Sequence, residues 1–90
     1  MSFRELEYVL AIERYRNISK AAESLYLSQP TLSKFLHTCE ESLGVRLFER
    51  NGNRYLLTHA GERYVDYARR ILRIQADMDN ELAEFASKAC

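Results

Sequence analysis

The stretch "LSQPTLSKFL", residues 27–36, decides how this chain folds, because it sets a polar, mostly uncharged turn in front of an apolar helical stripe. Ser28 is a favourable helix N-cap, and Pro30 falls in the first turn, where its missing N–H costs nothing. Apolar positions then recur at 4-3-4 spacing until Gly44, a residue typical of helix ends: Leu32, Leu36, Cys39 and Leu43. The spacing predicts a helix over about residues 29–43 that begins with its most polar turn.

Two shorter helical patterns precede this helix. Residues 3–15 are amphipathic, with apolar side chains at helical spacing: Phe3, Leu6, Val9 or Leu10, and Ile12. Asn17 or Ser19 can cap the next helix, which has a single apolar stripe: Ile18, Ala21, Ala22 and Leu25. Its paired alanines would let another helix cross closely. A short helix, a three-residue turn and a longer helix form a helix-turn-helix, in which the second helix enters the DNA major groove.

The first turn of that second helix carries small or flexible hydrogen-bonding side chains, which can meet base edges or phosphates: Gln29, Thr31 and Ser33. A glutamine amide can pair with adenine. Lys34 and His37 lie opposite the apolar stripe, within reach of phosphates or a guanine edge. The alternative interpretation is an ordinary capping cluster of Ser28, Thr31 and Ser33.

A hairpin is predicted directly after the helix-turn-helix. Val45, Leu47 and Phe48 form a short apolar strand, Asn51-Gly52 is a strong turn signal, and "RYLL" follows as the second strand. Arg50 and Arg54 lie around the tip, as in a wing over about residues 46–57 that contacts the DNA backbone or the adjacent minor groove. A solvent-exposed hairpin without a ligand is the alternative.

The overall charge of zero hides an uneven distribution. Residues 1–45 have a net charge of −1, residues 46–73 a net charge of +4, and residues 74–90 a net charge of −3. Every basic residue of the middle block is arginine, the side chain suited to planar, bidentate phosphate contact. A charged segment can also be no more than a solvated face, so charge alone does not decide the function.

A long helix is predicted for the last third of the chain, after a cap at Thr58. A heptad seam runs along it: Tyr64, Ala68, Ile71, Gln75, Met78, Leu82, Phe85 and Ala89. The small winged helix-turn-helix that precedes this helix cannot cover the whole seam, and pairing with a second chain is the simple solution. Gln75 could fix the register of that pairing. Packing back onto the same chain is the alternative.

Several classes of protein are not expected. The sequence has no secretory signal and no apolar run of about 20 residues that would span a membrane, which favours a cytoplasmic protein. Cys39 and Cys90 suggest two free thiols, and Cys39 continues an apolar stripe rather than forming a metal site with His37. Without a phosphate-binding loop, a carboxylate pair or a Ser–His arrangement, neither an enzyme nor a cofactor is expected.

The segments "AAESLYLSQPTLSK", "EESLGVRLFER" and "LTHAGERYVDYARRIL" resemble, in order and spacing, the N-terminal DNA-binding domain of a LysR-type transcriptional regulator. The resemblance implies a mainly α fold with a small β-hairpin: a winged helix-turn-helix over residues 1–58, and a dimerising linker helix over 59–90. It also implies a homodimer on inverted-repeat double-stranded DNA. The inducer would bind a C-terminal effector-binding domain outside this chain. The implied DNA-binding positions, with His37 added from its place on the helix, are Ser19, Ser28, Gln29, Pro30, Thr31, Ser33, Lys34, Arg50 and Arg54.

Some positions depart from the family pattern. Arg16-Asn17 replaces a common Gly-Ser pair, Lys34 replaces an arginine, and Phe35 occupies an expected outward position. His37 and Thr38 replace residues that are often basic, so fewer phosphate contacts than in a typical member are expected. Two other functions stay open: a non-specific nucleic-acid binder, and a winged-helix module that contacts protein.

Overall fold

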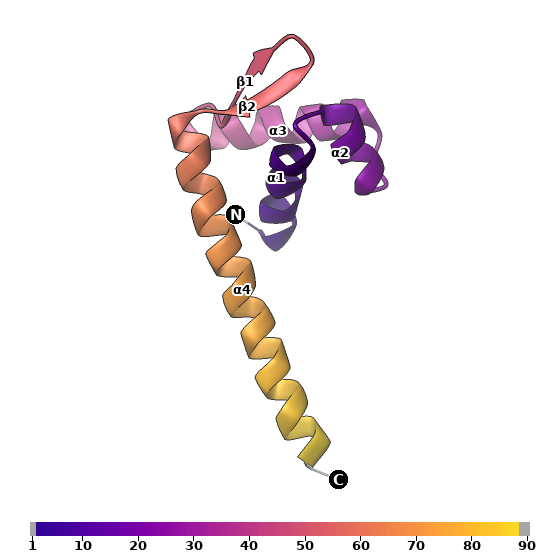
Figure 1. Cartoon of the computed structure of the whole chain (residues 1–90), viewed down its shortest axis with the longest axis vertical. Helices are drawn as coiled ribbons and strands as arrows, with labels where there is room; N and C mark the ends of the chain where they lie inside the picture. Colours follow the sequence, from indigo (N-terminus) through magenta and orange to yellow (C-terminus); the bar gives the residue numbers. More distant parts are fainter. Residues whose placement is uncertain (1, 89–90) are drawn as a thin grey trace.

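One long helix extends from a head of three shorter helices and a hairpin in the computed structural model, which describes residues 2–88 (Figure 1). The order along the chain is α1 (Phe3–Tyr15), α2 (Ile18–Ser24), α3 (Gln29–Leu43), β1 (Phe48–Asn51), β2 (Arg54–Leu57) and α4 (His59–Lys88). The predicted fold, a winged helix-turn-helix followed by a long helix, is confirmed.

Polar side chains begin the helices of the head as the sequence indicated. Of the two candidates for α2, Asn17 is the cap, because its Oδ1 accepts from the N–H of Lys20 at 2.9 Å. Ser28 caps α3 by accepting from the N–H of Thr31 at 3.2 Å. Gly44 ends α3 with φ of 76°, in the left-handed region where glycine carries no steric penalty.

The turn between α2 and α3 closes with two backbone bonds. Leu27 N–H donates to the carbonyl of Ala22 at 2.9 Å, and Tyr26 N–H donates to that of Glu23 at 3.1 Å. This pattern is a Schellman motif, which needs a left-handed residue. Tyr26 fills that position with φ of 59°, where glycine is usual, and its side chain is 96% exposed.

The core lies where α1, α2, α3 and the hairpin meet. Leu6, Val9 and Ile12 of α1 are buried, and so are Ala21 and Ala22 of α2, as expected of a close helix crossing. Phe35 was expected to point outward, and this was wrong: its ring packs edge-on against Tyr8, with 4.8 Å between centroids, at the margin of the core.

The hairpin turns one residue later than predicted. Asn51 pairs with Arg54, so the two loop residues are Gly52 and Asn53 rather than Asn51 and Gly52. Of these two loop residues only Gly52 has positive φ, 64°, which is the pattern of φ signs in a type II′ turn with glycine first.

The base of the hairpin joins α3 to α4. A carboxylate oxygen of Glu40, on α3, accepts from the N–H groups of Leu47 (2.6 Å) and Phe48 (3.2 Å). The carbonyl of Leu47 accepts from Thr58 N–H at 3.0 Å. The Thr58 hydroxyl donates to the carbonyl of Arg46 at 2.6 Å and accepts from Gly61 N–H at 3.0 Å, which confirms the predicted cap of α4.

A half-buried polar cluster links α1, α3 and α4. One carboxylate oxygen of Glu5 accepts from the thiol of Cys39 at 3.3 Å and from the hydroxyl of Tyr64 at 3.1 Å. Burial, reinforced by the Glu5 carboxylate, raises the pKa of the Cys39 thiol from 9.0 to about 12. Burial also raises the pKa of Tyr64, helped by the adjacent Cys39 and Glu5. Cys39 is 5% exposed, as expected for a small buried side chain.

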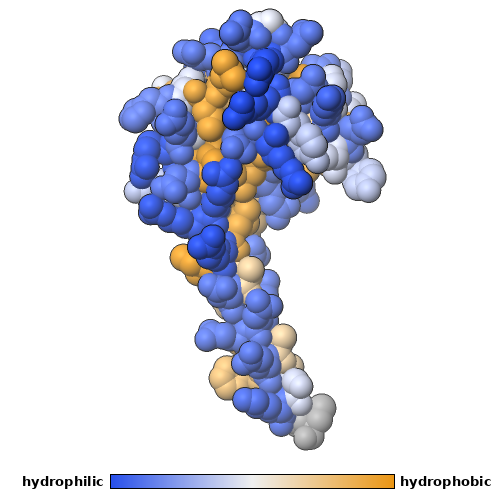
Figure 2. All heavy atoms as spheres, in the orientation of Figure 1, coloured by the Kyte–Doolittle hydropathy of each residue, from blue (hydrophilic) through white to orange (hydrophobic). Residues whose placement is uncertain are grey.

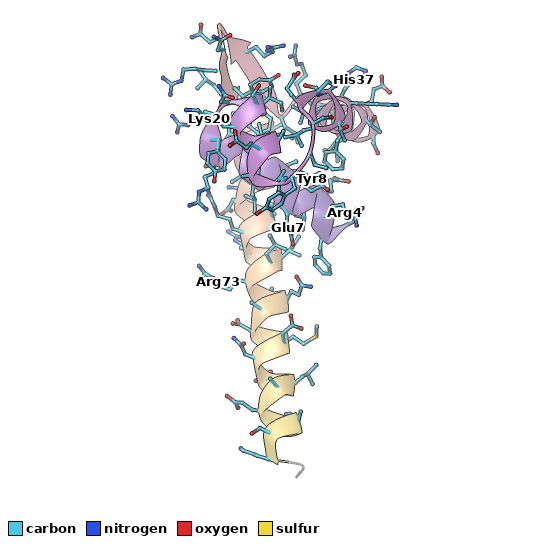
Figure 3. All side chains as sticks on the ribbon, turned by 90° about the vertical axis from the view of Figure 1, so that its right-hand side faces the viewer. Arg4, Glu7, Tyr8, Lys20, His37 and Arg73 are labelled. Atoms are coloured by element: carbon cyan, nitrogen blue, oxygen red, sulfur yellow. The ribbon has the colours of Figure 1, made fainter. Side chains whose placement is uncertain are left out.

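Only the first turns of α4 belong to the head. Val65 and Ala68 are buried there, and Arg69 pairs with Glu13 of α1 at 2.9 Å. The lower half of α4 extends alone in both Figure 1 and Figure 3, and apolar groups lie among hydrophilic ones along it in Figure 2. No helix within residues 2–88 is long and apolar enough to span a membrane.

Gly61 should not tolerate a side chain. A Cβ at this position would overlap the carbonyl oxygen of Leu47 and lie 3.0 Å from Cδ2 of Leu57. Although alanine favours helices by about 1 kcal/mol, we expect Gly61→Ala to lower the free energy of unfolding by about 1–3 kcal/mol, as measured by urea denaturation. Ser42→Ala, an exposed change in the last turn of α3, is the control. A Gly61→Ala protein as stable as wild type would contradict the close approach.

The cluster around Glu5 should make the protein sensitive to alkali. The unfolded chain loses the Cys39 proton near pH 9, whereas the folded chain holds it to about pH 12. The extra stability is therefore fully present below pH 9 and is lost as the pH rises towards 12. Between pH 8 and pH 11, we expect the free energy of unfolding of the double variant Cys39→Ala, Tyr64→Phe to fall by on the order of 2 kcal/mol less than that of wild type. The exposed control Tyr26→Phe should follow wild type, and equal losses in all three proteins would refute the assignment.

Candidate nucleic-acid interface

The first turn of α3 presents its polar side chains at the surface. Five residues at this end of the helix are exposed: Ser28, Gln29, Pro30, Thr31 and Lys34. Ser33 is half-buried. This exposure follows from the fold, because the apolar stripe turns the opposite face of α3 into the core. The turn is therefore free to contact a ligand.

Two hydrogen bonds order these side chains within the helix itself. The Ser28 hydroxyl donates to the Thr31 hydroxyl at 2.7 Å, and Nε2 of Gln29 donates to Oγ of Ser33 at 2.9 Å. Both pairs follow from the i,i+3 and i,i+4 spacing that puts residues on one face of a helix.

Arg50 of β1 is held beside α3 by Tyr55. The Arg50 guanidinium carbon lies 5.0 Å from the centroid of the Tyr55 ring, within the range of a cation–π contact. Tyr55 is only 6% exposed, and its N–H donates to the carbonyl of Arg16 at 3.0 Å. The ring also packs edge-on against Phe48. Tyr55, which supports Arg50, thus also anchors the hairpin to the end of α1.

A polar hollow unites three of the sequence-predicted positions, Ser19, Gln29 and Arg50. It lies where the start of α2, the first turn of α3 and the hairpin come together, and its other lining residues are Asn17, Ile18, Asn53 and Tyr55. The lining combines a guanidinium group with amide and hydroxyl groups, a set that suits an anionic, oxygen-rich ligand such as a phosphate backbone.

A second hollow adjoins the first, because Arg50 and Tyr55 line both. It also contains Ser33, His37, Glu40 and Arg46. His37 lies 3.0 Å from the Glu41 carboxylate, so its imidazole already has a partner on α3. Figure 3 shows His37 on α3 and Lys20 on α2 in the head of the molecule, far above Arg73 on α4.

Several residues that line these hollows are not among the predicted DNA-binding positions, and three of them carry amide or guanidinium groups: Asn17, Arg46 and Asn53. The sequence indicates Arg46 only as part of the basic block and Asn17 only as a cap, and the predicted turn at Asn51-Gly52 gives no role to Asn53. A correctly placed two-residue loop would have indicated Asn53. Conversely, Arg54 and Lys34 are exposed but line neither hollow.

The predicted dimer seam divides into two parts. Ala68 is fully buried and Tyr64 bonds to Glu5, so these two positions pack within the chain, contrary to the prediction. Ile71 and Gln75 are half-buried, and the remainder are exposed: Met78 (52%), Leu82 (57%) and Phe85 (72%). Tyr67 (52%) and Ile74 (67%) join this exposed face, whereas Ala89 lies outside the described residues.

Among residues 2–88, no group of three His, Cys, Asp or Glu side chains is placed to hold a metal ion. The two hollows instead offer hydrogen-bonding groups and the guanidinium groups of Arg46 and Arg50.

The sequence-family model for bacterial regulatory helix-turn-helix proteins of the lysR family matches residues 3–62. Among curated proteins, the chain is 45% identical over 73 residues to the DNA-binding transcriptional dual regulator OxyR of Escherichia coli K12. That match covers 81% of this chain and 24% of OxyR. It is 38% identical over 84 residues to the regulator CitR of Bacillus subtilis, covering 93% of this chain and 28% of CitR. The chain thus spans about a quarter of the length of these relatives.

Two solved structures show the same architecture. The CbnR_DBD–DNA complex contains a chain that is 35% identical, with a TM-score of 0.87, covering 96% of this chain and 99% of that chain. The BenM_DBD complex with benA site 1 DNA gives 32% identity and a TM-score of 0.91, covering 97% of this chain and 98% of that chain. With a family model that matches residues 3–62, this chain belongs to the lysR family of bacterial regulatory helix-turn-helix proteins.

Proposed function

We propose that this chain is the sequence-specific DNA-binding domain of a dimeric bacterial transcriptional regulator. The observation that carries the proposal is the polar hollow shared by the starts of α2 and α3 and by Arg50 of the hairpin. It is flanked by the exposed first turn of α3, which carries the groups able to meet base edges.

In this proposal, α3 enters the major groove with its first turn leading. Gln29 and Thr31 face base edges, with Ser33 bonded to Gln29 beside them, while Lys34 and the Ser28 cap lie towards phosphates. Pro30 donates no backbone hydrogen bond, so it shapes the turn and packs rather than bonds. His37 lies further along α3, where its bond to Glu41 reduces its availability.

The hairpin follows the DNA backbone as a wing. Arg50 and Ser19 line the same polar hollow and can both bind phosphates of one DNA strand. Arg54 is exposed at the hairpin tip and can reach the next phosphate or the minor groove. The DNA complexes of the CbnR and BenM domains support this docking, since their folds match at TM-scores of 0.87 and 0.91.

The hydrogen-bonding first turn of α3 favours sequence-specific reading over general nucleic-acid binding. A non-specific binder relies on charge, whereas α3 carries one lysine, no arginine and two glutamates. We likewise assign a regulatory rather than an enzymatic role, in the bacterial cytoplasm where the chromosome lies. An inducer would bind a C-terminal domain of the longer regulator rather than residues 2–88.

The exposed stripe of α4 supports a homodimer. Five large apolar side chains on this helix are more than half exposed, which is costly unless a second molecule covers them: Tyr67, Ile74, Met78, Leu82 and Phe85.

Charges beside this stripe favour antiparallel pairing. Arg63, Arg70, Asp77 and Glu84 recur every seven residues along one edge, with two positive charges followed by two negative ones. Asp66 contacts both guanidinium groups, at 3.5 and 3.0 Å, and keeps them on this edge. A two-fold axis perpendicular to α4 brings the same edge of both copies together in reverse order. Arg63 then faces Glu84 of the second copy, and Arg70 faces its Asp77.

Selection of binding sites from random duplex DNA should test the DNA-binding proposal. We expect an inverted repeat, and we expect Gln29→Ala to weaken binding to it by about 1–3 kcal/mol while changing binding to scrambled DNA little. Arg50→Ala should weaken binding to both duplexes and reduce the salt dependence of affinity. The control is Ser42→Ala, an exposed change in the last turn of α3. Equal, salt-sensitive binding to all sequences would indicate the non-specific function, and no binding at low salt would indicate a protein-interaction module.

Charge reversal should test the antiparallel dimer. The variant Arg63→Glu, Arg70→Glu gives this edge of each copy four negative charges, and the two edges face each other in the dimer. We expect its dimer dissociation constant to rise about 10-fold or more at low salt. Adding Asp77→Arg and Glu84→Arg should restore the affinity, as measured by sedimentation equilibrium. Asn80→Glu, on the side of α4 opposite the stripe, is the control. If the fourfold variant associates no better than the twofold variant, the pairing is not antiparallel in this register.

A further inference from the structure

The bond between Gln29 and Ser33 uses part of the hydrogen-bonding capacity of the glutamine. Nε2 of Gln29 lies 2.9 Å from Oγ of Ser33, to which it donates. A glutamine amide has one acceptor oxygen and two donor hydrogens. The bond therefore uses one hydrogen and leaves the oxygen and the second hydrogen free.

The free groups match the requirements of one base. In the major groove, adenine offers N7 as an acceptor and its N6 amino group as a donor, and a glutamine amide meets both through one oxygen and one N–H. Guanine instead presents two acceptors, N7 and O6, which the amide oxygen cannot satisfy. With Ser33 holding one hydrogen, all three bonding groups of the Gln29 amide have a partner on adenine or on α3.

The location of the two side chains allows the bond to persist in a complex. Gln29 is exposed, whereas Ser33 is half-buried and lines the second hollow behind it. A ligand that approaches α3 thus meets the outer side of the Gln29 amide while Ser33 supports it from within. A long side chain that is already oriented also loses less rotamer freedom on binding.

We propose that Ser33 is a positioning residue, which holds the amide of Gln29 in the orientation that reads an adenine in the major groove. The proposal rests on the DNA-binding function proposed above. To that function it adds the base that is read and the residue that orients the reading group.

The test measures base discrimination by Gln29→Ala, Ser33→Ala, Ser33→Thr and the double alanine variant. Each protein is titrated against the duplex selected by the wild-type chain, and against duplexes that carry every single base-pair change within it, at two salt concentrations. Circular dichroism and thermal unfolding establish that each variant is folded. Threonine retains the accepting hydroxyl and is the matched control for alanine.

The expected pattern is specific to one position. Gln29→Ala should reduce discrimination at one A·T pair about 10-fold or more. Ser33→Ala should reduce discrimination at the same pair by about 3- to 10-fold, with unchanged affinity for scrambled DNA and an unchanged salt slope. Ser33→Thr should retain discrimination, and Ser33→Ala should have no further effect in the Gln29→Ala background.

Other outcomes overturn the proposal. Loss of discrimination at a different base pair would make Ser33 a reader in its own right. A uniform loss of affinity with a smaller salt slope would make it a phosphate contact. Additive effects in the double variant would show that the two side chains act independently, and a G·C pair at the Gln29 position would refute adenine. If Gln29→Ala has no effect at any position, the reading role in the proposed function itself fails.

Discussion

The hydrogen bonds of the peptide groups around Leu47 fix how α3, the hairpin and α4 are arranged. Glu40 of α3 accepts from the N–H of Leu47, and the carbonyl of Leu47 accepts from Thr58 at the start of α4. Gly61 lies so close to that carbonyl that no side chain fits between them. Because the hairpin also begins here, a single segment sets the positions of the wing and the long helix relative to α3. A carboxylate holding two backbone N–H groups at the margin of the core is a strong constraint, since releasing it would leave buried donors unpaired.

A second constraint acts from the other side of the head. Glu5 joins Cys39 of α3 to Tyr64 of α4, and Arg69 of α4 pairs with Glu13 of α1. The first turns of α4 are therefore fixed at several points, whereas all of residues 76–88 are exposed. Any pairing through the exposed half would transmit its geometry to α3 through this fixed portion. The spacing and orientation of two recognition helices would then follow from the direction in which α4 leaves the head.

Local features could be predicted from the sequence because their causes are local. Ser28, Asn17, Thr58 and Gly44 mark helix ends by their own chemistry, and all four are found in these roles. The failures concern contacts made at a distance. The heptad seam gave no indication that Ala68 packs inside the head while Met78 is exposed, because both fit the same period. Phe35 turns inward because Tyr8 of α1 offers it a partner, and Glu40 looks like any surface carboxylate until the hairpin folds back over it. The candidate site divides in the same way: α3 was predictable, whereas Asn53 and Arg46 depend on how the hairpin lies.

The polar first turn of α3 now has a physical explanation. Serine and threonine are mediocre helix formers because their hydroxyl groups compete for backbone partners, and a helix that begins with several of them needs compensation. Here the Ser28 hydroxyl caps the helix and bonds to Thr31, while Ser33 receives an N–H of Gln29, so these groups are paired with one another. The turn thus keeps its polarity on an exposed surface while these hydroxyl and amide groups are paired within the helix. An ordered set of donors and acceptors, rather than a high density of positive charge, is what a neutral chain can use to distinguish one DNA sequence from another.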